Sequence, residues 1–302
     1  MTYNVIGFGA INLDKLFRVE RVAAAGEESF IVDHDEAPGG SAANTIVGLA
    51  RLGVRVGYIG KTAEDREGRV LLKSFTAEGV DVQGVVVSKV GRSGVVMGFV
   101  DRAGERALYV DPGVNDTLRF DEIPLDYARN TEFLHVTSFV GETPFHAQRQ
   151  LLDMTSEVKL SFDPGELYIR KGMAAMRPFL KRSHVVFPNE SELRLLTGLN
   201  FRAGAKKLRT EGAEIVAVKL GERGCYITNG EEEHTVDAYR VEVVDTTGAG
   251  DAFCAGFLYG LIEGQNLYEC GRLGNFVASR KIGRSGARAG LPSRAEVTAT
   301  AR

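Results

Sequence analysis

A short segment near the end of the chain combines the residue types that phosphate chemistry needs. Residues 244–253 read Val-Asp-Thr-Thr-Gly-Ala-Gly-Asp-Ala-Phe. Gly248 and Gly250 permit backbone conformations that other residues avoid, so consecutive N–H groups around them can converge on one anion. The carboxylate of Asp251 follows directly and could accept a proton at that place. The segment is therefore a candidate anion site with an adjacent base.

The residues after these glycines predict a helix over about 251–263. Its apolar residues would share one face: Phe253, Phe257, Leu258, Leu261 and Ile262. The N-terminal amides and the positive end of the helix dipole would point at the same anion. Aspartate is also a favoured N-cap residue. On this segment alone, Asp251 is as well explained by a helix cap as by a base.

The rest of the chain alternates between strand-like and helical segments. Short apolar strands are expected at 133–136, 159–162, 184–187 and 215–220, each next to a helical segment. This alternation predicts an α/β fold with a mostly parallel sheet that helices cover on both faces. Polar residues follow several strands: Ser138, Asp163, Asn189, Glu192, Lys219 and Gly221. We expect them to gather with residues 245–251 along the edge of the sheet where ligands bind.

The first quarter of the chain contains a second group of polar residues. A buried strand over 5–9 leads into Asn12 and Asp14, and a glycine turn at 37–40 leads into a helix over 41–52. On that helix, Asn44 lies in the first turn and faces the same loop as Ser41. Small residues here also suit a helix that packs closely against a neighbour. A strand at 54–59 and a helix at 66–77 complete a βα repeat.

Two segments predict a small separate sheet. Residues 95–100 and 106–110 form a hairpin pattern around the turn 101–104, and 28–36 is extended and charged. Four apolar residues of this region would build the core of the small sheet: Phe17, Phe30, Met97 and Phe99. No long linker, low-complexity tract or repeat suggests another domain.

Composition limits the function classes. The 302 residues carry a formal net charge of −3, which argues against a general nucleic-acid binder. Six basic residues share a stretch without acids: Arg272, Arg280, Lys281, Arg284, Arg288 and Arg294. Such a cluster is usually a solvated face, and the alternative is local attraction of a polyanion. No apolar run is long enough to span a membrane and the start lacks a secretory pattern, so we expect a cytoplasmic protein with free thiols at Cys225, Cys254 and Cys270.

Other phosphate-binding and catalytic motifs do not fit. The Gly7-Phe8-Gly9 segment lacks the third glycine of a dinucleotide fingerprint, and Asp251 stands where a P-loop needs lysine. No protein-kinase HRD loop is present, and the five histidines lack metal-ligand spacing. The segment Asn189-Glu190-Ser191-Glu192 begins a helix directly after Pro188. Its glutamates either complement the helix dipole or, near a phosphate, hold magnesium through water.

Taken together, these segments resemble the ribokinase-like, or PfkB-type, family of sugar and nucleoside kinases over nearly the whole chain. The motifs occur in the order of the family: Asn12-x-Asp14, Gly39-Gly40-Ser41-Ala42-Ala43-Asn44, Pro112-Gly113-Val114-Asn115, Asn189-x-x-Glu192, Lys219-Leu220-Gly221-x-x-Gly224 and Asp245-Thr246-Thr247-Gly248-Ala249-Gly250-Asp251. Each motif alone is weak, but their common order is specific.

The resemblance implies a three-layer ribokinase-like fold with a small β-sheet lid. The main domain would comprise 1–14, 39–93 and 111–302, and the lid 15–38 and 94–110. Asp251 would be the general base, and the amides of Gly248, Ala249 and Gly250 the anion hole. The residues implied to bind substrate are Asn12, Asp14, Gly39, Gly40, Ser41 and Asn44. Those implied to lie along ATP are Asn189, Lys219, Gly221, Gly224, Gly248, Gly250 and Asn275.

The resemblance also implies cofactors and partners. Glu192 would serve a Mg²⁺–phosphate network through water. A monovalent cation such as K⁺ would lie near Asp245, Thr247, Ser285, Gly286 and Gly290. In several relatives the lids pair two subunits, which implies a homodimer here.

The substrate stays open between two kinase classes and a sensor. Ribokinases proper usually carry lysine in place of Ser41 and a hydroxyl residue in place of Lys219, so the chain departs from them at both positions. The leading hypothesis is an ATP-dependent kinase for a primary hydroxyl of a small sugar. The alternative is a nucleoside kinase, with the base packed on the lid aromatics. A non-catalytic sensor is the third possibility, although the complete glycine turn with Asp251 argues against it.

Overall fold

A computed structural model describes residues 2–300 of the chain. Its main sheet has the strand order β13-β12-β11-β10-β9-β8-β1-β4-β5. The strands are β1 Tyr3–Phe8, β4 Val56–Ala63, β5 Asp81–Ser88, β8 Thr131–Thr137, β9 Lys159–Asp163, β10 Ser183–Val186, β11 Ile215–Lys219, β12 Cys225–Thr228 and β13 Glu233–Val236. Among the described strands of this main sheet, the pairs β11–β12 and β12–β13 are antiparallel and the other pairs are parallel. The expected parallel sheet is thus confirmed, while β5, β12 and β13 were not anticipated.

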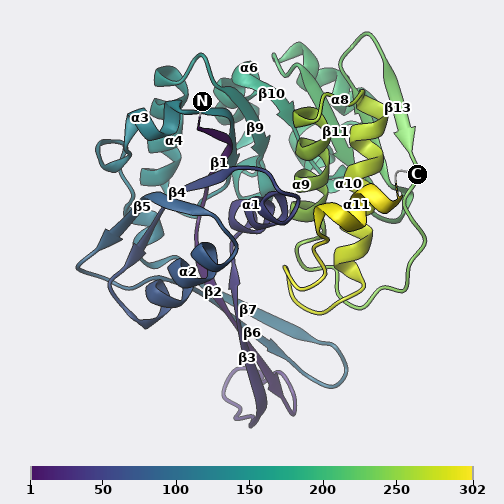
Figure 1. Cartoon of the computed structure of the whole chain (residues 1–302). Helices are drawn as coiled ribbons and strands as arrows, with labels where there is room; N and C mark the ends of the chain where they lie inside the picture. The colour runs from purple at the N-terminus through teal and green to yellow at the C-terminus, as the bar shows by residue number, and fades with distance from the viewer. Residues whose placement is uncertain (1, 301–302) are drawn as a thin grey trace.

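Helices cover both faces of this sheet (Figure 1). One core lies under α1 Ser41–Arg51, α2 Arg66–Ala77, α9 Ala249–Ile262, α10 Leu267–Ile282 and α11 Arg294–Thr300. The opposite core lies under α3 Leu125–Arg129, α4 Glu142–Met154, α5 Gly165–Ile169, α6 Gly172–Arg182, α7 Glu190–Thr197 and α8 Phe201–Thr210. Short 3₁₀ turns occur at Gly113–Thr117, Phe120–Glu122 and Gly221–Arg223. The architecture is the expected three layers.

Helix α9 is more deeply buried than its sequence suggested. Residues 252–260 are all buried, because the helix packs against both α1 and α10. The expectation of a single apolar face was therefore wrong. A Cβ on Gly48 of α1 would come within 2.8 Å of Ala255 Cβ, and a Cβ on Gly256 would overlap the backbone of Leu273 in α10. These glycines let three helices approach closely, and the approach of α1 to α9 joins the two halves of the candidate site.

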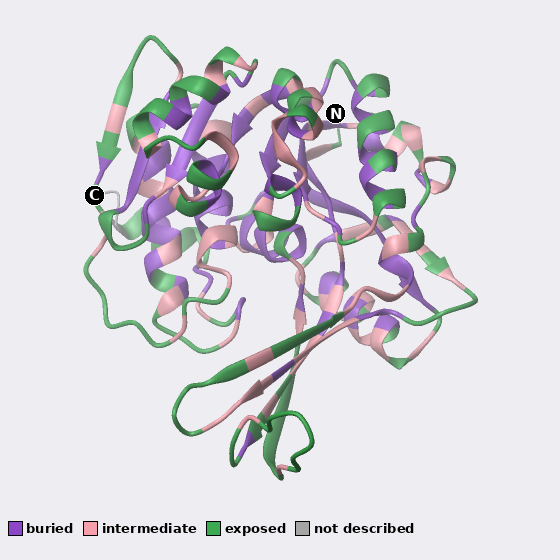
Figure 2. Ribbon diagram, turned by 180° about the vertical axis from the view of Figure 1, so that it is seen from behind, coloured by how far each residue is buried: buried purple, intermediate pink, exposed green. Residues whose placement is uncertain are grey.

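The second sheet has the order β3-β2-β6-β7 and extends away from the main body (Figure 1). Its strands are β2 Asn12–Val19, β3 Ile31–Gly39, β6 Gly94–Val100 and β7 Arg106–Asp111. Figure 2 shows that much of it is exposed. Phe17 stacks on Phe99 with ring centroids 5.1 Å apart, as expected for a small core. Phe30 is 70% exposed and does not belong to that core.

Two simpler expectations concern the whole chain. The three cysteines are free, as predicted, and all three are buried. Among the described residues, no helix has both the length and the apolar character needed to cross a membrane.

Candidate functional site

Asp251 is held inside the protein at the start of α9. Gly248, at φ +76°, is the N-cap of this helix, and Asp251 is the third helical residue. The alternative that Asp251 is itself the cap is therefore wrong, since its Oδ2 instead accepts a hydrogen bond of 2.8 Å from Asn44 Nδ2. Burial raises the pKa of Asp251 to about 7, although the bond from Asn44 opposes the rise. Such a carboxylate can accept a proton near neutral pH.

Asn44 is fixed by a third residue, Arg288, which sequence reasoning did not assign to the site. The Nε of Arg288 donates to Asn44 Oδ1 at 2.8 Å, and its terminal nitrogens donate to Gly39 O and Ser74 Oγ at 3.3 Å. Because arginine can only donate, the orientation of the Asn44 amide is determined: the oxygen faces Arg288 and the nitrogen faces Asp251. A line of three side chains thus orients the candidate base.

The basic stretch around Arg288 is not simply a solvated face, so that interpretation needs correction. Arg288 and Lys281 are buried, with 9% and 0% of their surface accessible, whereas the side chains of Arg280 and Arg294 are more than half exposed. A buried cation needs partners, and both residues have them at the candidate site. The sequence signal for this role was the position of the stretch, which comes soon after the glycine segment in the chain. Part of it is the loop around Ala287 that packs on Gly248.

The turn at Gly39 and Gly40 forms the opposite wall of the site. Gly40 has φ +100°, and a Cβ there would overlap the carbonyl oxygen of Ala10. A Cβ on Gly39 would overlap the carboxylate of Asp14, so the turn can seat that carboxylate only as glycine. Burial raises the pKa of Asp14 to about 6, and the charge of Arg288 opposes the rise. Ser41 is exposed at the first position of α1.

Asn12 is positioned by the motif that ends in Asn115. Asn115 Nδ2 donates to Asn12 Oδ1 at 3.0 Å and to Ile11 O at 2.9 Å, while its Oδ1 accepts from Ile11 N. Asn115 is buried, so it holds the exit of the first strand rather than facing a ligand. The residues that the sequence predicted to bind substrate therefore lie close together at the base of the small sheet.

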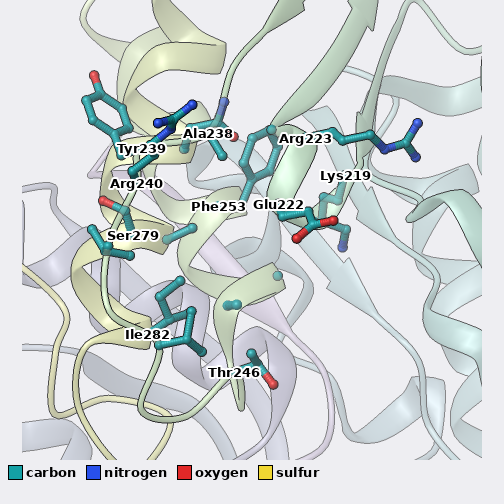
Figure 3. A pocket seen from close by; sticks show the side chains of 18 of the residues that line it. Lys219, Glu222, Arg223, Ala238, Tyr239, Arg240, Thr246, Phe253, Ser279 and Ile282 are labelled. Atoms are coloured by element: carbon teal, nitrogen blue, oxygen red, sulfur yellow. The ribbon is translucent and has the colours of Figure 1, made fainter.

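A cavity of about 880 Å³ lies on the other side of the glycine segment. Most residues expected along a nucleotide line it: Asn189, Lys219, Gly221, Gly224, Gly250 and Asn275. In Figure 3, Lys219 and Glu222 lie on one side, Tyr239 and Arg240 on the other, and Phe253 between them. Asn275 Nδ2 donates to the carbonyls of Val236 and Asp237, so its amide supports the wall of the cavity.

A buried ion pair lies directly beneath the glycine segment. Lys219 Nζ donates to Asp163 Oδ2 at 2.8 Å and lies 3.4 Å from the position that a Cβ on Gly250 would take. Burial alone would lower the pKa of Lys219, but the charges of Asp163 and Glu192 outweigh it and raise that pKa. Asp163 was expected at the sheet edge without a role. Opposite charges at the ends of two strands of the same edge, β9 and β11, were the signal for the pair, although β10 lies between these strands.

Asn189 and Glu192 form a capping box at the start of α7. Asn189 Oδ1 accepts from Glu192 N, and Glu192 Oε2 accepts from Asn189 N, both at 2.8 Å. Burial raises the pKa of Glu192, and the charge of Lys219 opposes the rise. Within the described residues, no three acidic, histidine or cysteine side chains form a metal site. Glu192 and Asp163 do fit Mg²⁺, which takes one or two carboxylates and completes its shell with water and phosphate.

The residues proposed for a monovalent cation do come together, but they do not fit one. Asp245 Oδ1 accepts from Thr247 N at 2.9 Å, and Oδ2 accepts from Gly286 N at 2.8 Å. Ser285 lies exposed beside Gly286. The ammonium of Lys281 donates to Asp245 O at 2.6 Å and lies 3.9 Å from Oδ2. A positive charge is thus already present at Asp245.

The chain is similar to known proteins in sequence and in fold. The sequence model of the pfkB family carbohydrate kinases matches residues 4–294. An uncharacterised sugar kinase of Archaeoglobus fulgidus is 48% identical over 82% of this chain and 98% of its own length. The ATP-dependent ribose-1-phosphate kinase of Halopiger xanaduensis is 32% identical over 94% of this chain and 93% of its own. The Arabidopsis thaliana ribokinase, solved with ribose and ATP, superposes with a TM-score of 0.87 at 25% identity over 99% and 98% of the two chains.

Proposed function

The chain belongs to the pfkB family of carbohydrate kinases. We propose that it transfers the γ-phosphoryl group of ATP to a primary hydroxyl of a small sugar. The observation that carries the proposal is the buried carboxylate of Asp251, oriented by Asn44 and placed between the substrate turn at Gly39–Gly40 and the nucleotide cavity. A base at this position can reach a hydroxyl on one side and a phosphoryl group on the other.

In the proposed reaction, Asp251 takes the proton of the attacking hydroxyl as the new O–P bond forms. The bond between the γ-phosphorus and the β–γ bridging oxygen of ATP breaks at the same time, and ADP leaves. The backbone amides of Gly248, Ala249 and Gly250, at the positive end of α9, stabilise the charge on the transferring phosphoryl oxygens. Lys219 lies next to Gly250 and adds a largely buried positive charge at the same place. These groups act chiefly by position and electrostatics, which is how phosphoryl transfer is accelerated.

The sugar would bind through groups on both sides of the turn. Asp14 and Asn12 offer acceptors to its hydroxyls, and Asn44 and the backbone at Gly40 complete the site, with Ser41 at its margin. The small sheet rises from these residues, since β2 begins at Asn12 and β3 ends at Gly39. We propose that residues 15–38 and 94–110 close over the substrate as a lid and exclude water, which would otherwise accept the phosphoryl group.

ATP would occupy the cavity of Figure 3, with its phosphates toward Gly250 and Lys219. Magnesium, when bound, neutralises charge on these phosphates. Glu192 and Asp163 would hold it through its water molecules. The support for ATP is the cavity itself and the nucleotide bound to the Arabidopsis ribokinase.

A panel of acceptors tests the substrate class. ADP formation would be measured with ribose, fructose, ribose 1-phosphate, adenosine, cytidine and guanosine. Turnover of a sugar supports the proposal, and preferential turnover of a nucleoside supports the nucleoside kinase. Tight sugar binding with no turnover on any acceptor supports the sensor.

The Asp251→Asn variant tests the mechanism with the best acceptor. Its kcat should fall by about 10²–10⁴-fold, because a carboxamide cannot accept the proton. ATP binding, measured by calorimetry, should stay unchanged and serves as the folding control. Near-normal turnover in this variant would contradict the role of Asp251.

We also propose that two chains pair through their lids. Five apolar side chains of the small sheet are each more than half exposed: Ile31, Val32, Leu108, Tyr109 and Val110. They lie on β3 and β7, the two edge strands of the small sheet, so both edges offer exposed apolar surface for contact with a second chain. Sedimentation equilibrium should show a dimer that the Val32→Lys variant dissociates. A wild-type monomer at micromolar concentration would contradict the pairing.

A further inference from the structure

Lys281 has a position that the proposed reaction does not use. It lies in the last turn of α10, and its side chain has no accessible surface. Instead of reaching solvent, as lysines at helix ends usually do, it points at the segment that leads into the anion hole. Its ammonium donates to the backbone oxygen of Asp245 at 2.6 Å. A buried ammonium needs such partners, because burying an isolated charge is strongly unfavourable.

All three oxygens of Asp245 are engaged. The backbone oxygen accepts from Lys281, Oδ1 accepts from Thr247 N, and Oδ2 accepts from Gly286 N. The ammonium also lies 3.9 Å from Oδ2, so the carboxylate has an opposite charge beside it. A further cation at Asp245 would meet a like charge and would have to displace these donors.

The same contacts connect Lys281 to the anion hole. The last carbonyl of α10, that of Ile282, accepts from the amides of Val244 and Asp245. Directly after Asp245, the backbone turns at Thr246–Ala249, where Ala249 N donates to Thr246 O at 3.1 Å. On the other side, Ala287 lies 3.0 Å from the place of a Cβ on Gly248. Lys281 and the adjacent Ile282 therefore hold the backbone at Val244 and Asp245, which leads into the glycine segment.

We infer that the ammonium of Lys281 is a built-in cation that replaces a monovalent metal ion beside Asp245, so that phosphoryl transfer by this enzyme needs no K⁺. Lys281 acts as a positioning residue, through Asp245 and the turn that follows it. The inference rests on the proposed function, since the amides it positions are those proposed to hold the phosphoryl group.

The first test compares salts in the wild-type protein. The rate with the best acceptor would be measured in KCl, NaCl, CsCl and choline chloride at one ionic strength, since choline is too large to enter the site. The expected result is the same rate, within about twofold, in all four. A rate in KCl more than about fivefold above that in choline chloride would overturn the inference, whatever any variant does.

The second test removes the ammonium while keeping the length of the side chain. The Lys281→Met variant should lose at least about tenfold of its rate in choline chloride, and KCl or NH₄Cl should restore part of that loss. An unchanged rate in every salt would show that Lys281 has no positioning role. The matched control is Arg280→Met, on the same turn of α10 but exposed, which should leave both the rate and the salt response unchanged.

A third measurement needs no substrate. A ligand that binds only the folded state raises the melting temperature, so KCl should raise the Tm of the Lys281→Met variant above its value in choline chloride. The wild-type Tm should be equal in the two salts. If no acceptor is phosphorylated, the proposed function fails. The Tm values in KCl and in choline chloride still show whether the Lys281 ammonium takes the place of K⁺. If acceptors are phosphorylated and the wild-type Tm rises specifically with KCl, the inference alone fails.

Discussion

Asn44 Nδ2 donates a hydrogen bond of 2.8 Å to Oδ2 of Asp251, although the two residues are separated by 207 positions in the chain. The bond favours the ionised carboxylate and so lowers the pKa of Asp251, against the larger effect of burial. Replacing Asn44 by Ala should therefore move the acid limb of the kcat/KM profile to higher pH and lower the plateau by about 10-fold or more. A profile that keeps its midpoint would show that Asn44 does not act on the base.

The pH dependence of the wild-type enzyme follows from the same group. A pKa of about 7 for Asp251 means that kcat/KM should fall about tenfold per pH unit below that value and level off above it, since only the ionised form accepts a proton. The measurement is a rate profile between pH 5 and 9 with a pH-insensitive coupling system. A flat profile across this range would contradict the assignment.

The stability of the fold should fall as pH rises, whereas kcat/KM should rise. The folded protein keeps the proton of Asp251 up to about pH 7, whereas an aspartate in the unfolded chain releases it near its ordinary pKa of 3.8. The contribution of this group to stability is complete below the unfolded pKa and is lost as pH rises to about 7. Asp251→Asn should thus raise the Tm at pH 8, with an upper bound of about 4 kcal/mol from the three-unit shift. A lower Tm at pH 8 would oppose this reasoning.

Arg288 should affect the substrate side more than the nucleotide side. Arg288→Met leaves Asn44 Oδ1 and Gly39 O without their donor and removes the cation facing Asp14. We expect at least a tenfold rise in KM for the sugar, a lower kcat and an unchanged KM for ATP. Ser74→Ala removes only the distant partner of the same guanidinium and should change neither KM. Equal effects of the two variants would indicate general loosening.

The ion pair of Lys219 and Asp163 allows stability and activity to be separated. Lys219→Met leaves Asp163 buried and unpaired, which should destabilise the protein by about 3–5 kcal/mol. The double variant Lys219→Met/Asp163→Leu should recover most of that stability, because apolar side chains replace buried pairs well. Its kcat should remain about 10²-fold low, since the charge beside Gly250 is still missing. Denaturant unfolding measures the predicted stabilities, and steady-state kinetics measures kcat. Recovered activity in the double variant would contradict the electrostatic role of Lys219.

How far the sequence predicts this molecule depends on how local each signal is. The alternating strands and the order of the motifs suffice to predict the layers of the fold, because each pattern is contained in a few residues. The same short motifs single out Asp14, Asn44 and Asp251 as candidates for the site. Arg288 and Lys281 could not be assigned, because their roles depend on partners at Asn44 and Asp245. The short strands β12 and β13 have four residues each, too few for a clear period.

The close approach of α1 and α9 also bears on how the chain becomes active during synthesis. Gly48 and Ala255 meet, and Thr45 donates to the backbone of Asp251, only when the first fifth of the chain packs on the last. Contacts between such distant segments form late in folding. A nascent chain that has emerged only as far as β13 carries the turn at Gly39–Gly40 without Asp251, so under the proposed mechanism it cannot transfer a phosphoryl group from ATP before the domain is complete.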